Sequence, residues 1–98
     1  MILVRDVFRL KFGKAKDAKA LMKEAKQMME AEEAQNYRVM FDLVGPSYTM
    51  VWEGTHDSLA AWEASMQTGM SKADWRGWYE KFIPLIESSN REIFTLVE

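Results

Sequence analysis

The chain has 98 residues, a formal net charge of −2 and no cysteine. With 48% hydrophobic and 29% charged residues, its composition is that of a folded globular protein and not of a disordered one. The basic residues are too dispersed for a nucleic-acid-binding protein, and the lack of cysteine excludes disulfides, thiolate metal sites and a cysteine nucleophile. We therefore expect one cytoplasmic domain, residues 1–98, with neither a signal peptide nor a membrane span.

The first third of the chain predicts a strand followed by a long helix. In residues 2–12, Val4, Phe8 and Leu10 fall on one face and charged residues on the other, which is typical of a half-buried strand. From residue 15 to about residue 34, apolar residues recur at helical spacing and the opposite face carries Lys and Glu. Neither proline nor glycine interrupts that stretch.

Residues 37–44 and 48–55 predict the two strands of a β-hairpin. If residues 44–47 form the loop, a single register gathers large apolar residues on one face and opposite charges on the other. The pairs are Leu43 with Tyr48, Phe41 with Met50, Val39 with Trp52, and Arg38 with Glu53. A shift by one residue would exchange the two faces, so this agreement favours the register strongly.

Two helices are predicted next. The first begins near Asp57, with Thr55 or Asp57 as its N-cap. The second covers residues 71–86, and Pro84 predicts a kink or a break near its end, because proline removes a backbone donor.

The chain closes with a predicted turn at residues 88–90 and a strand at residues 91–97. The order of elements is then βαββαβ. This order predicts a ferredoxin-like α+β fold, with a four-stranded antiparallel sheet and helices on one face.

The sheet face turned away from the helices is expected to be unusually apolar for a solvated surface. It combines apolar side chains with charged ones: Leu3, Val7, Met40, Val51 and either Phe94 or Val97, beside Arg5, Arg9, Arg38, Asp42 and Glu53. We expect two copies to pack through this face in a homodimer, with a higher assembly left open. A monomer that tolerates the exposed apolar groups is the alternative.

The candidates for function are one histidine, one arginine and a set of aromatic residues. His56 could serve as a general base or ligand anchor, or could simply bond to backbone near a helix start. Arg9 could hold an anionic group or pair across the dimer. The aromatic candidates could line a slot for a flat ligand or form only a core: Tyr37, Tyr48, Trp52, Trp62, Trp75, Trp78 and Tyr79.

No cofactor and no metal is expected. The single histidine has no carboxylate partners at metal-ligand spacing, and the five scattered glycines match no phosphate-binding loop.

Three stretches resemble proteins of the dimeric α/β-barrel superfamily. FRLKFGK at residues 8–14 resembles their first strand and glycine turn, and DSLAAWEA at 57–64 resembles the second helix of the antibiotic biosynthesis monooxygenase and NIPSNAP branches. DWRGWYEKFIPLI at 74–86 is most similar to NIPSNAP-type domains. The resemblance implies a homodimer with a cavity between each sheet and its helices. Such proteins include cofactor-free monooxygenases, isomerases and members without known activity.

Three functions remain open at this point. The chain could bind a small, largely apolar or aromatic molecule, act as a cofactor-independent monooxygenase or isomerase on an aromatic or polyketide-like substrate, or serve only in assembly. The related monooxygenases usually carry a Glu-x-Trp pattern at the end of the third strand, and this chain has Gly54, Thr55 and His56 there. That difference favours the binding function.

Overall fold

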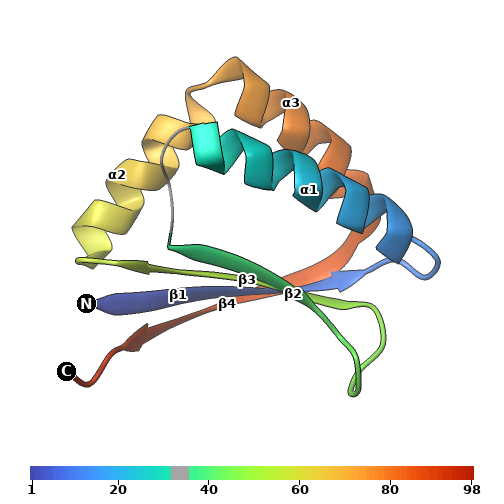
Figure 1. Ribbon diagram of the computed structural model, residues 1–98, viewed down its shortest axis with the longest axis horizontal. Helices are drawn as coiled ribbons and strands as arrows, with labels where there is room; N and C mark the ends of the chain where they lie inside the picture. The colour runs from blue at the N-terminus through green and yellow to red at the C-terminus, as the bar shows by residue number, and fades with distance from the viewer. Residues whose placement is uncertain (32–35) are drawn as a thin grey trace.

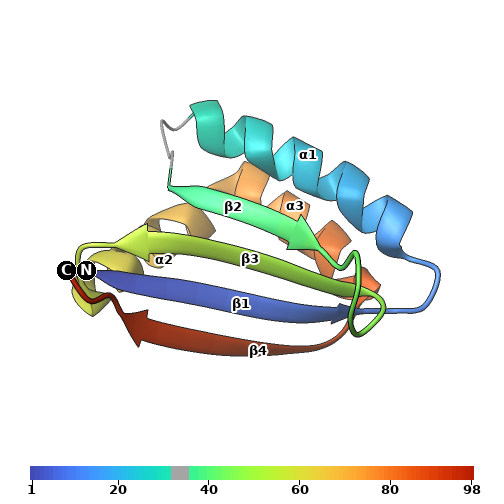
Figure 2. The same ribbon diagram turned by 60° about the horizontal axis from the view of Figure 1, so that its bottom comes forward.

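The computed structural model describes residues 1–31 and 36–98, and within them an antiparallel sheet is covered on one face by helices (Figure 1). The strands are β1 (Ile2–Leu10), β2 (Tyr37–Phe41), β3 (Thr49–His56) and β4 (Ile86–Thr95), in the spatial order β2-β3-β1-β4 (Figure 2). The helices are α1 (Ala15–Ala31), α2 (Leu59–Met70) and α3 (Ala73–Phe82). The ferredoxin-like α+β prediction is confirmed. None of the described helices combines the length and the apolar character that crossing a membrane requires.

The hairpin of β2 and β3 has the predicted register. Arg38 pairs with Glu53, Val39 with Trp52 and Phe41 with Met50. The loop is longer than predicted because the side chain of Asp42 ends the ladder, its Oδ1 accepting a hydrogen bond from the Thr49 backbone N–H at 2.9 Å. The predicted pairing of Leu43 with Tyr48 is therefore wrong, since both lie in the loop.

The N-cap of helix α2 lies one residue after Asp57 and three residues after Thr55, the two predicted caps. Ser58 is the N-cap, and its Oγ accepts a hydrogen bond from the Ala61 backbone N–H at 3.1 Å. Thr55 and His56 still belong to β3, so the proposed cap at Thr55 is wrong, and Asp57 precedes the cap.

The predicted turn at residues 88–90 is wrong, because these residues lie within β4. Asn90 pairs with Val7 and Ser89 with Phe8 of β1. Strand β4 is at the edge of the sheet, where polar side chains remain solvated and do not end a strand. The predicted break at Pro84 is confirmed, since the short 3₁₀ helix η1 (Ile83–Leu85) separates α3 from β4.

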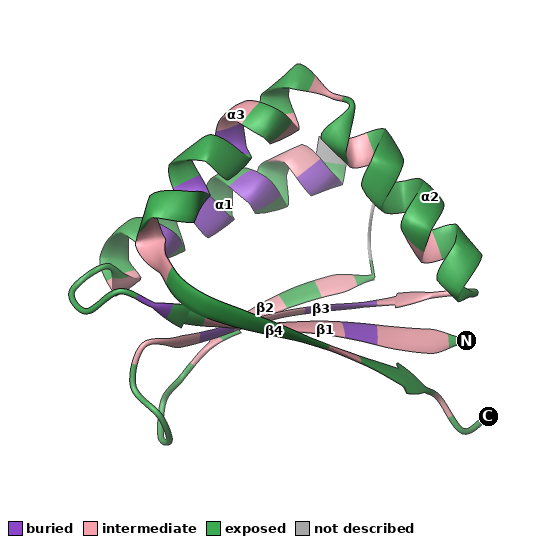
Figure 3. Cartoon of the chain, turned by 180° about the vertical axis from the view of Figure 1, so that it is seen from behind, coloured by how far each residue is buried: buried purple, intermediate pink, exposed green. Residues whose placement is uncertain are grey.

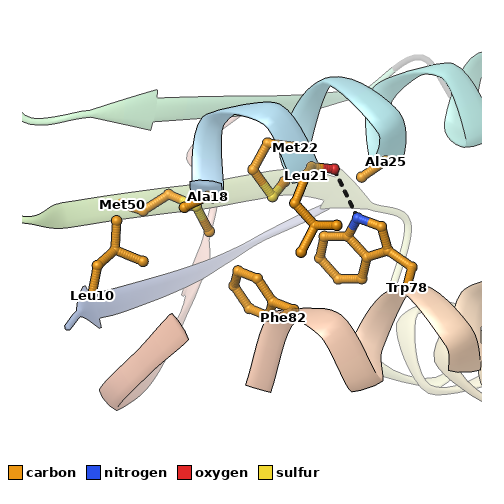
Figure 4. Packing of buried hydrophobic residues seen from close by; sticks show 8 residues of the cluster. All are labelled: Leu10, Ala18, Leu21, Met22, Ala25, Met50, Trp78 and Phe82. Atoms are coloured by element: carbon orange, nitrogen blue, oxygen red, sulfur yellow. Dashed lines mark hydrogen bonds between the residues drawn. The ribbon is translucent and has the colours of Figure 1, made fainter. Parts of the chain in front are cut away.

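The core lies between the sheet, α1 and α3. Its buried members come from β1, β3 and these two helices: Leu10, Ala18, Leu21, Met22, Ala25, Met50, Trp78 and Phe82 (Figure 4). Helix α2 contributes no buried residue and is exposed along most of its length (Figure 3). The space beneath α2 is therefore less tightly filled than the space beneath α1 and α3.

Candidate functional site

A cavity of about 580 Å³ lies between the helix-facing side of the sheet and helices α2 and α3. Many of its lining side chains are aromatic: Phe8, Tyr37, Trp52, Trp62, Trp75, Trp78, Tyr79 and Phe82. Strand alternation explains the strand members, because residues 50, 52, 54 and 56 of β3 all face the helices. The aromatic positions predicted from the sequence are thus largely brought together in one place.

Three tryptophans form the centre of the cavity wall. The ring centroid of Trp52 lies 5.7 Å from that of Trp78 and 6.4 Å from that of Trp75, and Trp75 lies 5.8 Å from Trp78. The Trp52–Trp78 and Trp75–Trp78 pairs meet edge to face, which is a favoured geometry for aromatic rings. Trp78 is buried, whereas Trp52 and Trp75 are only half-buried and present part of their surface to the cavity.

Tyr37 and His56 form a polar corner of the cavity. The Tyr37 hydroxyl lies 3.4 Å from His56 Nε2, so the phenol can donate a weak hydrogen bond when that nitrogen carries no proton. Gly54 makes this arrangement feasible, because a Cβ atom at position 54 would stand 2.6 Å from Cδ1 of Tyr37. The tyrosine ring therefore lies across the bare backbone of β3.

Burial lowers the pKa of His56 below its ordinary value, and the nearby carboxylate of Asp57 opposes part of that effect. The imidazole is consequently neutral at neutral pH, with one of its two ring nitrogens unprotonated. Chemically, this corner can accept a proton from a molecule in the cavity or accept a hydrogen bond from it.

An ion pair at another edge of the cavity was not predicted from the sequence. Arg91 Nε donates to Asp6 Oδ1 at 2.6 Å, and the Arg91 guanidinium carbon lies 4.9 Å from the centroid of the Trp62 ring. Both charged residues line the cavity. The sequence does contain one indication of a polar group at this place, because Asp6 interrupts the apolar alternation of Val4 and Phe8 on the helix-facing side of β1.

Two of the predicted residues lie elsewhere. Arg9 is exposed in β1, on the opposite sheet face from Phe8 and Leu10, so it does not line the cavity. Tyr48 packs against Phe12 in the loop region, with ring centroids 4.9 Å apart. Among the described residues, no three His, Asp or Glu side chains group closely enough to hold a metal ion.

No protein-family model matches the chain, and no curated protein sequence matches it. Solved structures do match in fold. A NIPSNAP family protein from Agrobacterium tumefaciens matches with a TM-score of 0.89 at 19% identity, over 99% of this chain and 86% of that one. An uncharacterized NIPSNAP domain protein from Burkholderia xenovorans matches with a TM-score of 0.83 at 12% identity, over 99% and 95%.

A candidate antibiotic biosynthesis monooxygenase from Nitrosomonas europaea matches with a TM-score of 0.74 at 12% identity, over the whole of both chains. Identities this low establish a common fold and leave the chemistry open. The chain is thus a ferredoxin-like α+β protein whose structural neighbours are NIPSNAP family proteins and antibiotic biosynthesis monooxygenase-like proteins.

Proposed function

We propose that the protein binds a flat, largely apolar or aromatic small molecule in this cavity, and that it does so as a cytoplasmic homodimer. The observation that carries the proposal is a wall of aromatic rings interrupted by only a few polar groups. The volume of about 580 Å³ also falls within the range of roughly 300–1,000 Å³ that small-molecule pockets occupy.

The aromatic rings that line the cavity differ in how far the protein itself covers them. Trp78 and Phe82 stack with centroids 4.8 Å apart and are buried. Trp75 is half-buried and Tyr79 is exposed, although both belong to the same helix α3. A flat molecule lying under α2 would cover these rings, and burial of that apolar surface would favour binding.

The test measures the affinity of flat neutral aromatic compounds, beginning with 2-naphthol, by quenching of tryptophan fluorescence. Tyr79→Ala is expected to weaken binding at least about fivefold, since aromatic contacts contribute roughly 1 kcal/mol or more. Ile83→Ala is the matched control, because Ile83 is exposed to a similar extent as Tyr79 but lies outside the cavity lining.

Two results together would contradict the binding function: no flat compound binds, and a native mass spectrum of freshly purified protein shows no mass beyond the polypeptide. They would indicate that the protein serves only in assembly.

A second candidate function rests on the polar corner. A neutral His56 beside Tyr37 can take a proton from an acidic C–H or O–H group of an aromatic substrate, as a cofactor-independent monooxygenase or isomerase requires. The name of the Nitrosomonas europaea neighbour supports this reading. In His56→Gln, hydrogen–deuterium exchange at the α-carbon of 2-tetralone should fall to the background rate while 2-naphthol binding is retained. Equal exchange by both proteins would exclude the enzymatic function.

The homodimer is supported by the sheet face that the helices leave open. Arg38, Glu53, Arg5 and Glu92 form a row of alternating charge across β2, β3, β1 and β4. Glu53 is only 4% exposed and pairs with Arg38, and Arg5 Nε is buried without a hydrogen-bond partner among the described residues. The Arg38 side chain itself is 73% exposed, so a second copy packed on this face would cover the cationic member of the pair.

The rows on either side of these charges are largely apolar. Met40, Val51 and Val7 lie together on one side, and Leu3 and Phe94 on the other. The loop between β2 and β3 bends toward this open side of the sheet (Figure 1). A second copy packed there would cover both the apolar rows and the charges between them.

A further inference from the structure

The guanidinium group of Arg91 is held in place at the edge of the cavity from two directions. Asp6 accepts a hydrogen bond from Nε at 2.6 Å, and the guanidinium packs over the Trp62 ring at 4.9 Å. These contacts connect β1, β4 and the otherwise unburied helix α2. An arginine restrained in this way loses little side-chain entropy when it binds a further partner.

The two Nη groups of Arg91 are left available by these contacts. Within residues 1–31 and 36–98, the guanidinium donates only through Nε, so four of its five N–H donors have no protein acceptor. The two Nη groups form a planar fork whose geometry matches the two oxygens of a carboxylate. Arg91 lines the cavity, and the neighbouring Ser89 and Asn90 also line it.

The ion pair favours an anionic partner over a cationic one. The side chain of Arg91 is 44% exposed and that of Asp6 is 24% exposed, so the cation is the more accessible member of the pair. Asp6 Oδ1 already accepts a hydrogen bond from Arg91 Nε. The fork of Nη groups therefore offers more free hydrogen-bonding capacity than the carboxylate does.

A flat surface lies beside this fork. Asp6 pairs with Trp52 on one side and with Arg91 on the other, so all three residues share a single row across the sheet. We infer that the ligand is a flat aromatic carboxylic acid, with its ring against the tryptophans and its carboxylate on the Nη groups of Arg91. This inference rests on the proposed function, because it assigns a polar end to the ligand of the same cavity.

The experiment compares 2-naphthoate with its neutral counterpart 2-naphthamide by isothermal titration calorimetry on the intact protein. We expect naphthoate to bind about tenfold more tightly than naphthamide, because hydrogen bonds to charged groups are the stronger ones. Arg91→Gln should remove this preference, because it should lower the affinity for naphthoate more than the affinity for naphthamide. Arg76→Gln, at an exposed position of α3 outside the cavity lining, should change neither value.

A thermal melt of each variant shows whether it folds, and Arg91→Lys supplies a second variant should the glutamine variant unfold. Lysine keeps the charge and loses the fork, so it should retain only part of the preference. Equal affinities of the two compounds for the native protein would overturn the acid inference and leave the proposed cavity intact. Binding of neither compound would overturn both.

Discussion

The indole Nε1–H of Trp78 donates a 2.8 Å hydrogen bond to the backbone carbonyl oxygen of Leu21 and so joins helix α3 to helix α1. The two residues are 57 positions apart, and both belong to the buried core (Figure 4). The same indole also lines the cavity on its other side. Trp78 therefore fixes the position of α3 relative to α1 and, with it, one wall of the candidate site.

Replacing Trp78 by Phe should test this connection. The variant keeps an aromatic ring but removes the donor and some buried volume, so the free energy of unfolding should fall by about 1–3 kcal/mol. Urea denaturation followed by far-UV circular dichroism measures the change. Trp78→Ala should cost more, about 3–5 kcal/mol, because it also leaves a cavity. An unfolding free energy of Trp78→Phe equal to that of the native protein would contradict the proposed connection.

Gly54→Ala should disturb the site and the fold together. The added Cβ atom would stand 2.6 Å from Tyr37, so the ring must shift from its present position beside His56. We expect a loss of roughly 1–3 kcal/mol in unfolding free energy, because added groups in a packed region force side chains out of place. Fluorescence-monitored urea denaturation checks the value.

The matched control for that variant is Gly77→Ala in α3. An added Cβ atom there has no neighbour within 4 Å. Since alanine is the better helix former, this variant should be more stable than the native protein by roughly 0.5–1 kcal/mol. If both substitutions changed the free energy of unfolding equally, the Tyr37 ring could move off Gly54 without a cost in stability.

The lowered pKa of His56 predicts a pH dependence with a definite sign. The unfolded chain binds more protons than the folded one between the folded pKa and the unfolded pKa of about 6.5. The contribution of His56 to the free energy of unfolding is therefore lost as the pH falls through that interval. Because Glu and Asp residues titrate alike in both proteins, the His56→Gln variant should become more stable relative to the native protein as the pH falls. Chemical denaturation of both proteins at several pH values measures this difference.

A proton NMR titration of the His56 ring gives the same information directly. Its midpoint should lie below the ordinary value, because burial disfavours the imidazolium form. Asp57→Asn should lower the midpoint further, since the Asp57 carboxylate raises the pKa. An unchanged midpoint in that variant would show that the Asp57 carboxylate does not affect the pKa of His56.

Val51→Glu should disrupt the proposed dimer without unfolding the chain. Val51 lies on the open sheet face between Met40 and Val7, and a carboxylate there would have to be desolvated on association. The native protein should give a native mass of two 11.4 kDa chains, and the variant a mass of one. Val97→Glu, beyond the end of β4, should keep the dimer. A native protein that is monomeric at micromolar concentration would contradict the interface.

The hairpin register was predictable from the sequence because two independent patterns agreed on it, the apolar pairs on one face and Arg38 with Glu53 on the other. The polar run at residues 88–90 was misassigned, because the same composition suits a turn and a solvated edge strand, and only the pairing with β1 separates the two. Arg91 already fell within the predicted strand, but its partner Asp6 is 85 positions away and the pair was not predicted. Long-range contacts of this kind follow from the topology and not from local composition.

Two copies of the sheet can be packed face to face in two orientations. The alternating row of Arg38, Glu53, Arg5 and Glu92 places opposite charges against one another in only one of them. If a copy of the sheet is turned over about an axis parallel to the strands, the order of the row reverses, and every cation meets an anion. If it is turned over about an axis along the row, each residue meets its own counterpart, and like charges face one another. In the proposed dimer, this charge pattern would therefore select the relative orientation of the two sheets while adding little to the strength of their association.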